Sequence, residues 1–258
     1  MLSDWEDVHK ELKREFKRRM PSGTEVAARA VDEWTAKHSS DADWIKSHFS
    51  QLVEEIQSSA YEFYLRSEAN IGQSVIKQIF SAMVSSKDTA GDTVNLFASY
   101  FRSLDKFFLG LTQGRRARAG SAFQQIIKEM FKRLGYPFSS QPVINGQPDF
   151  LLPSEEYFRQ NAIDCIVFTV KRTLRERWRQ IVTEGIAGTG FYLATIDEDI
   201  ATRDIKEMAK SKIFLVLPDR LKKARKDYLK APNVITFEEF FEYYLDPAMK
   251  RWKAKKVI

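Results

Sequence analysis

The chain is poor in the side chains that most often bind soft metals or act as a general base. Its 258 residues include one cysteine, Cys165, and three histidines, at positions 9, 38 and 48. A single cysteine excludes an internal disulfide and any zinc site built from several cysteines. The region after residue 48 has no histidine, so its chemistry must rest on carboxylates, lysine and arginine. Cys165 lies within an apolar, β-branched run, and we predict that it packs there as a small hydrophobic residue.

Several other common signals are missing. There is no run of 18 apolar residues, the length needed to cross a membrane as a helix. The first residues lack the basic and apolar regions of a secretory signal. The phosphate-binding patterns Gly-x-x-x-x-Gly-Lys and Gly-x-Gly-x-x-Gly are absent as well. We therefore expect a reduced, cytoplasmic protein with no membrane partner, and nothing supports a nucleotide-binding fold.

Positive charge, by contrast, is plentiful and clustered. The formal net charge is +6, and the basic residues gather mainly in the second half of the chain. The clusters are 171–179, 222–230, 250–256 and the smaller group Arg115, Arg116 and Arg118. Any one of them can be a solvated helix face. Together they favour a polyanionic partner, because each neutralised phosphate of a nucleic acid releases counterions.

The first 112 residues have the pattern of an all-helical region. Apolar residues recur there at helical spacing and no strand pattern appears. We expect the long stretch 41–86 to break near Gly72. The basic, glycine-bracketed segment 113–120 predicts a boundary between a helical N-terminal domain, 1–112, and a second domain, 113–258.

The second domain has an α/β pattern. A predicted helix at 121–134 is followed by short apolar runs that alternate with helical segments. The runs are 149–152, 164–170, 191–196, 213–218 and a shorter candidate edge strand at 233–237. This alternation predicts a mixed central sheet flanked by helices.

Three side chains of this domain can act together on a phosphodiester. Asp149 opens one predicted strand, and Lys171 ends the next. If these strands pair in a hairpin, the carboxylate and the ammonium group converge at one edge of the sheet. Glu184, on the helix predicted after Lys171, can reach the same point. Chance placement on the surface is the alternative that the pattern alone leaves open.

Asp149 and Glu184 are the candidate metal ligands. Carboxylate oxygens suit Mg²⁺, which keeps several waters and takes phosphate oxygens as further ligands. The metal would polarise the phosphodiester, while Lys171 would orient the nucleophile or balance the developing charge. The predicted catalytic set is therefore Asp149, Lys171 and Glu184, with Mg²⁺ as cofactor.

The order of these residues resembles the PD-(D/E)xK nuclease superfamily. It is most similar to the type II restriction endonucleases of the EcoRII-related group, which read CCGG, CCNGG or CCWGG cores. In that group Ser or Thr stands two positions before the lysine, and a glutamate on the next helix supplies the missing carboxylate. Thr169 and Glu184 occupy these places, and Pro148-Asp149 supplies the first element. The resemblance implies a restriction-endonuclease-like fold.

The same resemblance assigns DNA recognition to Arg175, Glu176 and Arg177, a basic-acidic-basic triplet four residues after the lysine. Arginine donors match the O6 and N7 acceptors of guanine, and a glutamate accepts from the N4 amino group of cytosine. At a helix N-terminus in the major groove, such a triplet can read adjacent C·G pairs. The alternative is a solvated first helical turn, and the spacing from Lys171 favours recognition.

The chain departs from this group at one position. The group usually carries a further glutamate on the helix before the Pro-Asp element, and here the comparable position is Gln124. A neutral amide can orient a metal-bound water but adds no charge. Glu129 is an alternative, although its helical phase places it on the polar side.

The resemblance implies a Mg²⁺-dependent enzyme that cuts double-stranded DNA at a palindromic site with a CCGG-like core, leaving 5′-phosphates and overhanging ends. A palindrome implies a homodimer or larger homo-oligomer. Region 1–112 would contact flanking DNA or mediate oligomerisation. Two alternatives stay open: a nuclease-fold DNA-binding protein with little or no catalysis, and a structure-specific repair nuclease.

The recognition triplet makes a direct prediction. Arg177→Ala should weaken binding to the specific site by roughly 1–3 kcal/mol, because it removes one bidentate contact to guanine. Binding to unrelated duplexes should change far less. Competition assays with specific and unrelated duplexes measure both affinities. An equal loss of affinity for the two kinds of duplex would show that Arg177 does not recognise bases.

Overall fold

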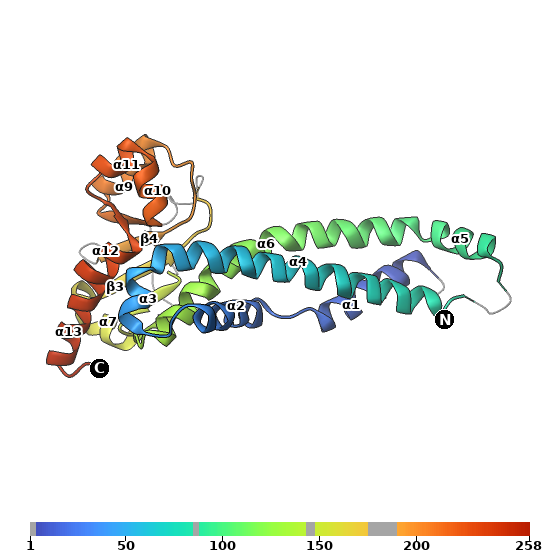
Figure 1. The fold of residues 1–258 in the computed structure, drawn as a ribbon, viewed down its shortest axis with the longest axis horizontal. Coiled ribbons are helices and arrows are strands. Elements are labelled where there is room, and N and C mark those ends of the chain that lie inside the picture. The colour runs from blue at the N-terminus through green and yellow to red at the C-terminus, as the bar shows by residue number, and fades with distance from the viewer. Residues whose placement is uncertain (1–3, 85–87, 143–147, 175–189) are drawn as a thin grey trace.

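The computed structural model describes residues 4–84, 88–142, 148–174 and 190–258. Two long helices, α4 (Phe49–Ser81) and α6 (Phe101–Arg133), run side by side and give the molecule an elongated shape. At one end they join an α/β body, and at the other they form a helical rod (Figure 1).

The N-terminal half is helical, as predicted. Its remaining helices are α1 (Trp5–Arg19), α2 (Gly23–Lys37), α3 (Ala42–Ser47) and α5 (Ala90–Ser99). The N-terminus of α2 follows from its sequence: the Ser22 side chain accepts from the backbone of Glu25, and the Glu25 carboxylate accepts from the backbone of Ser22. This reciprocal capping starts the helix directly after Pro21.

A six-stranded mixed sheet lies at the centre of the second half, in the order β1-β2-β3-β4-β5-β6. Pairs β1–β2 and β2–β3 are antiparallel, and the remaining neighbours are parallel. The strands are β1 (Ser139–Ser140), β2 (Phe150–Leu152), β3 (Ile166–Val170), β4 (Gly190–Ala194), β5 (Ile213–Leu217) and β6 (Val234–Thr236). The five predicted strands are confirmed, and the two-residue β1 adds a sixth.

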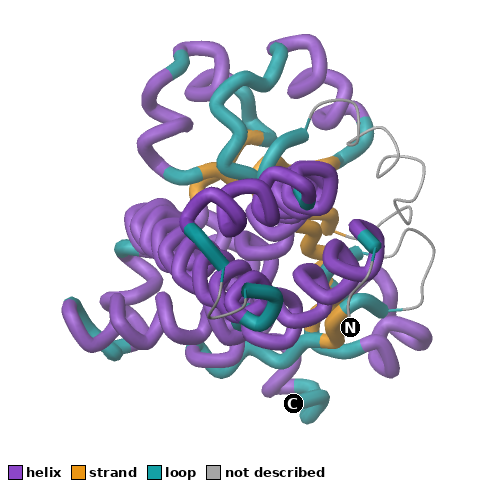
Figure 2. The backbone as a smooth tube through the Cα atoms, turned by 90° about the vertical axis from the view of Figure 1, so that its right-hand side faces the viewer, coloured by secondary structure: helices purple, strands orange, loops and turns teal. Residues whose placement is uncertain are grey.

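Helices cover both faces of this sheet (Figure 2). They are α7 (Glu155–Asn161), the 3₁₀ turn η1 (Ala162–Asp164), α9 (Thr202–Lys210), α10 (Asp219–Ala224), α11 (Lys226–Lys230), α12 (Phe237–Phe240), the π-helical turn η2 (Phe241–Leu245) and α13 (Asp246–Ala254). One face packs against α2, α4, α6 and the C-terminal helices, and the other against α9, α10 and α11.

Two predicted helix breaks are wrong. Helix α4 continues through Gly72, and α6 continues through the segment 113–120. A glycine inside a helix costs about 1 kcal/mol relative to alanine. Packing outweighs this cost, because the first part of α6 packs against α1 and its last part against the sheet.

The hydrophobic core does not follow the predicted division at residue 112. Residues of α2 and of the first half of α4 share one core with the sheet, whereas α1 and the far ends of α4 and α6 form a separate cluster in the rod.

Among the residues that the structure describes, no helix is both long and apolar enough to cross a bilayer.

Phe131 should contribute strongly to stability because it joins α6 to the sheet. Its side chain is 1% exposed, and its ring lies 5.6 Å from the ring of Phe150 and 5.3 Å from that of Phe168. Phe131→Ala should lower the free energy of unfolding by about 3–5 kcal/mol. Phe101 lies on the same helix and is 73% exposed, so it supplies the control. Phe101→Ala should change the free energy of unfolding by less than about 0.5 kcal/mol. Denaturant titration measures both, and similar losses would contradict this account of the core.

Candidate active site

Strand pairing brings Asp149 and Lys171 together. Strands β2 and β3 are antiparallel, and Phe150 pairs with Phe168. Asp149 therefore stands just before β2, close to the end of β3, where Lys171 follows Val170. Lys171 Nζ lies 3.2 Å from Asp149 Oδ2, and the two form an ion pair. The predicted convergence of these two side chains is observed.

The Asp149 carboxylate is buried and held by three donors. Oδ1 accepts a hydrogen bond from Gln124 Nε2 at 2.9 Å, and Oδ2 accepts from the backbone N–H of Val170 at 2.7 Å as well as from Lys171. Asp149 is only 7% exposed. A carboxylate removed from water in this way needs such partners, because burial without them is costly.

Helix α6 places Gln124 against this carboxylate. Its neighbours Phe123, Ile126 and Ile127 are fully buried and anchor that turn of the helix in the main core. Glu129, the alternative from the sequence, lies near Arg133 and Lys132 instead, at 3.6 and 3.8 Å. Gln124 is therefore the residue of α6 that reaches Asp149.

Lys171 and Thr169 belong to the same face of the β3 segment, because side chains alternate along a strand. Thr169 is buried. The backbone N–H of Lys171 bonds to the carbonyl of Ala194 on β4, which fixes the end of β3. The ammonium group remains accessible, since the Lys171 side chain is 33% exposed.

The sequence reasoning missed two positioning residues after β4. The Asp197 carboxylate accepts from the backbone N–H of Leu174 at 2.8 Å, and the Thr195 hydroxyl donates to the carbonyl of Arg172 at 3.2 Å. Both contacts hold the chain between Lys171 and residue 175. A polar residue directly after a buried strand was the only available signal, and it does not reveal the partner.

The remaining predicted site residues, Glu184 and the triplet Arg175, Glu176 and Arg177, lie outside the described residues. Within the described part of the chain, no three histidine, cysteine or acidic side chains form a group that could hold a metal ion. Of the two predicted metal ligands, Asp149 lies within the described residues.

The Asp149–Lys171 pair on antiparallel strands, within a mixed sheet flanked by helices, matches the arrangement expected of the nuclease class described above. The sequence model of the family described as EcoRII C terminal matches residues 74–241, more than half of the chain. The chain belongs to this EcoRII C-terminal family. The predicted family is confirmed.

Two curated relatives agree with this result. The chain is 24% identical over 229 residues to the type II restriction enzyme EcoRII of Escherichia coli, which covers 85% of this chain and 50% of the relative. It is 27% identical over 155 residues to the type II restriction enzyme SsoII of Shigella sonnei, and this match covers 55% of this chain and 50% of the relative. The chain therefore spans about half the length of the curated relatives it matches.

Solved structures confirm the fold. Metal-depleted Ecl18kI in complex with uncleaved, modified DNA has a TM-score of 0.79 and 20% identity, over 96% of this chain and 86% of that one. The complex of the restriction endonuclease PspGI with substrate DNA has a TM-score of 0.64 and 19% identity, over 91% of this chain and 94% of that one. The predicted restriction-endonuclease-like fold is correct.

Cys165 should be chemically inert in the folded protein. It is 2% exposed, and burial together with the nearby charge of Asp164 raises the pKa of its thiol to about 12. The thiol is therefore protonated at neutral pH, and the thiolate is the reactive form. A colorimetric disulfide reagent should label Cys165 only after unfolding in guanidinium. Rapid labelling of the native protein would contradict both the burial and the predicted packing role.

Proposed function

We propose that the protein is a Mg²⁺-dependent type II restriction endonuclease that cuts double-stranded DNA at a palindromic site with a CCGG-like core. It would leave 5′-phosphates and overhanging ends. One observation supports this most strongly: Asp149 and Lys171 meet at 3.2 Å on paired strands, in a chain of the EcoRII C-terminal family. EcoRII is a type II restriction enzyme, and the similar solved structures are complexes with DNA, which points to the same substrate.

The surroundings of Asp149 fit a divalent cation. Within the part of the chain that the structure describes, Oδ2 accepts two hydrogen bonds and Oδ1 accepts one, which leaves Oδ1 a lone pair for a cation. The amide of Gln124, once turned, would offer its oxygen beside Oδ1, and oxygen ligands are those that Mg²⁺ prefers. Glu184 is the proposed second carboxylate. When bound, Mg²⁺ supplies Lewis-acid polarisation of the phosphodiester.

The protein's own groups then have distinct roles. Lys171 would balance charge that develops on the phosphate, because its ammonium group is fixed beside Asp149 yet accessible. Gln124 would orient Asp149 and a water molecule. Arg175, Glu176 and Arg177 would read the C·G pairs. A homodimer, or a larger homo-oligomer, would present one such site to each DNA strand, and region 1–112 would contact flanking DNA or support assembly.

A second candidate is a nuclease-fold DNA-binding protein with weak or no catalysis. Gln124 favours it, because an amide contacts Asp149 where the family usually provides another carboxylate. A structure-specific repair nuclease is the third candidate, and it would cut at junctions or ends without a fixed sequence. Incubation with a large phage or plasmid DNA separates the three.

Lys171→Ala should reduce DNA cleavage by at least about 100-fold, the effect of removing one preorganised electrostatic group. Binding should be largely retained, because Asp149 keeps its hydrogen bonds to Gln124 and Val170. Lys206→Ala, at an exposed position on α9, is the control and should cut like the original protein.

The assay is gel analysis of DNA cleavage in Mg²⁺ and in EDTA. Discrete, reproducible bands in Mg²⁺ alone would support the proposed function, and mapping their ends gives the site. A smear would indicate a nuclease without sequence preference, and no cleavage would indicate the DNA-binding protein. Normal cutting by Lys171→Ala would refute the assignment of the active site.

A further inference from the structure

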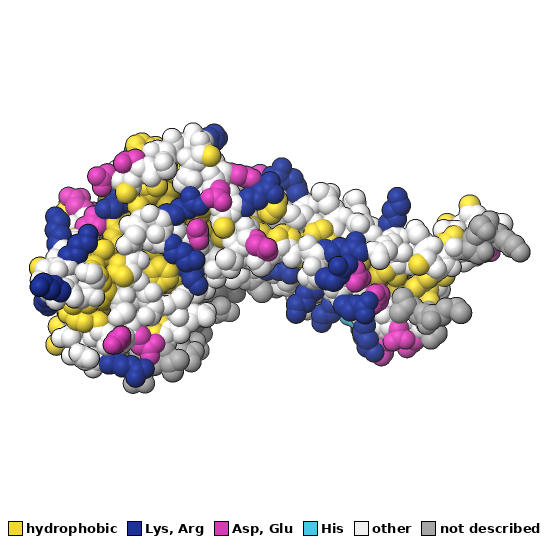
Figure 3. Space-filling view, turned by 90° about the horizontal axis from the view of Figure 1, so that it is seen from below, with side chains coloured by type: hydrophobic (Ala, Val, Ile, Leu, Met, Phe, Trp, Pro, Cys, Tyr) yellow, Lys and Arg dark blue, Asp and Glu magenta, His cyan; other side chains and the backbone are white. Residues whose placement is uncertain are grey.

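The rod carries a cleft between α1 and α6 that the catalytic residues do not use. Its volume is about 370 Å³. Residues of α1, α4 and α6 line it, among them His9, Lys13, Lys17, Lys106, Gln113 and Arg118. These residues include three lysines and one arginine but no acidic side chain. Figure 3 shows basic side chains gathered on this part of the rod. The cleft is suited to a polyanion.

Helix α1 directs unpaired charge into the cleft. His9, Lys13 and Lys17 recur every four residues and so share one face of the helix. The other cations of α1 have acidic partners: Lys10 pairs with Asp7, Arg14 pairs with Glu11, and Arg18 and Arg19 share Glu15. No carboxylate of the described residues lies within ion-pair distance of Lys13 or Lys17. The positive charge that α1 leaves without a partner is therefore concentrated in the cleft.

Helix α6 connects the cleft to the active site. Lys106 precedes Gln124 by 18 residues, which is five turns of an α-helix, so both lie on the same face. Gln113 and Gly110 fall close to this face as well. Gly110 and Gly114 have no side chain, and nothing lies within 4 Å of where a Cβ would stand, so this wall of the cleft is open. One continuous helix face thus leads from the Asp149 contact into the cleft.

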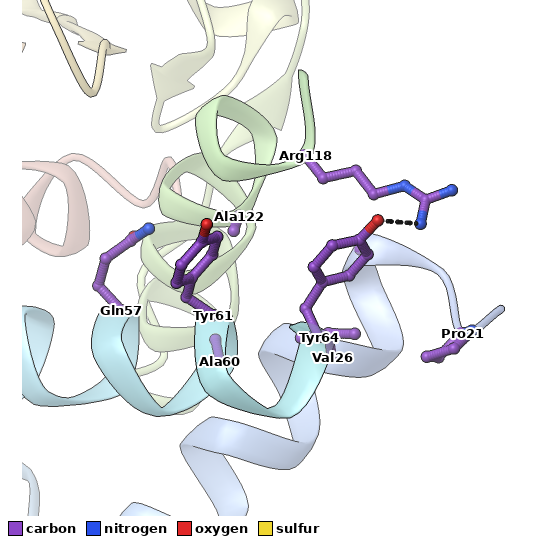
Figure 4. Close-up of a pocket in the computed structure, with 9 residues that line it drawn as sticks. Pro21, Val26, Gln57, Ala60, Tyr61, Tyr64, Arg118 and Ala122 are labelled. Atoms are coloured by element: carbon purple, nitrogen blue, oxygen red, sulfur yellow. Dashed lines mark hydrogen bonds between the residues drawn. The ribbon is translucent and has the colours of Figure 1, made fainter. Parts of the chain in front are cut away.

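Arg118 lies between the cleft and a smaller pocket beside α2 and α4 (Figure 4). It donates to the Tyr64 hydroxyl at 3.0 Å, and its guanidinium stands 5.1 Å from the centre of the Tyr64 ring. Arg115, one turn earlier, is instead paired with the buried carboxylate of Glu68. No described acid neutralises Arg118, and its charge stays available at this border.

We propose that this cleft binds backbone phosphates of the DNA that flanks the cleavage site. Lys13, Lys17 and Lys106 would hold the phosphates, and Arg118 would continue the contact toward the active site. At 1.5 Å per residue, Gln113 and Lys106 stand about 16 and 27 Å along α6 from Gln124. With 3.4 Å between phosphates of one strand, a duplex that follows α6 would be held about five to eight base pairs from the scissile phosphate. The inference rests on the proposed function for the position of that phosphate.

The test is the salt dependence of DNA binding. For a duplex of about 40 base pairs, the slope of log affinity against log salt should become shallower by about 2 for each bound subunit of the double variant Lys13→Gln/Lys17→Gln, and so by about 4 for the proposed homodimer, because each phosphate contact contributes about 0.9. The control Lys10→Gln/Lys206→Gln removes the same charge at exposed positions outside the cleft and should leave the slope nearly unchanged. Circular dichroism checks that both variants are folded.

Flank length provides a second readout. Duplexes carrying the mapped site with about 2 or about 12 base pairs on each side should differ in salt slope for the original protein, and the difference should largely vanish in Lys13→Gln/Lys17→Gln. An unchanged salt slope in Lys13→Gln/Lys17→Gln would overturn the proposal. If light scattering then showed a changed oligomeric mass for this variant, the cleft would be a contact between copies of the chain and not a DNA-binding site. The salt slope on an arbitrary duplex measures binding and does not require cleavage. A failure of the proposed function would be seen in a separate assay, as absence of DNA cleavage in Mg²⁺.

Discussion

The candidate active site depends on the burial of one carboxylate. Asp149 is withdrawn from water at the edge of the sheet, and it is tolerated there because an amide, a backbone N–H and an ammonium group all donate to it. These donors come from α6 and from the end of β3. The helix, the strand pair and the lysine must therefore be in register before the carboxylate can be accommodated. The packing of α6 in the core therefore determines whether Gln124 can contact the Asp149 carboxylate.

Helix α6 links the two ends of the molecule. Phe131 and its neighbours anchor its last turns on the sheet, Gln124 contacts Asp149, and the first half packs against α1 and α4 in the rod. A single helix of 33 residues thus carries the active site contact and one wall of the basic cleft. Under the proposed function, this arrangement would hold DNA beside the cleavage site in a defined position relative to Asp149.

Much of this could be predicted from the sequence. Alternating apolar runs revealed the five main strands, and the order of Asp149 and Lys171 on adjacent strands predicted that they would meet. Gln124 was identified through the family resemblance. The roles of these residues, and those of Glu184 and the triplet, stay predictions.

The rest could not be predicted for physical reasons. Gly72 and the glycine-bracketed segment 113–120 suggested breaks, but tertiary packing on both sides keeps α4 and α6 continuous. Helical periodicity shows which face of α2 is buried but not that it is buried in the same core as the sheet. The contact of Asp197 with Leu174 joins residues 23 positions apart, and no local pattern marks it.

The proposed function depends on Asp149 as a metal-binding carboxylate, and a Mn²⁺ binding experiment can show whether it has this role. Electron paramagnetic resonance can count and titrate bound Mn²⁺ on the protein in complex with DNA. Asp149→Asn preserves the shape of the side chain and removes its charge. We expect the original protein to bind Mn²⁺ and Asp149→Asn to bind it at least about tenfold more weakly. Equal affinity in the two proteins would contradict the claim.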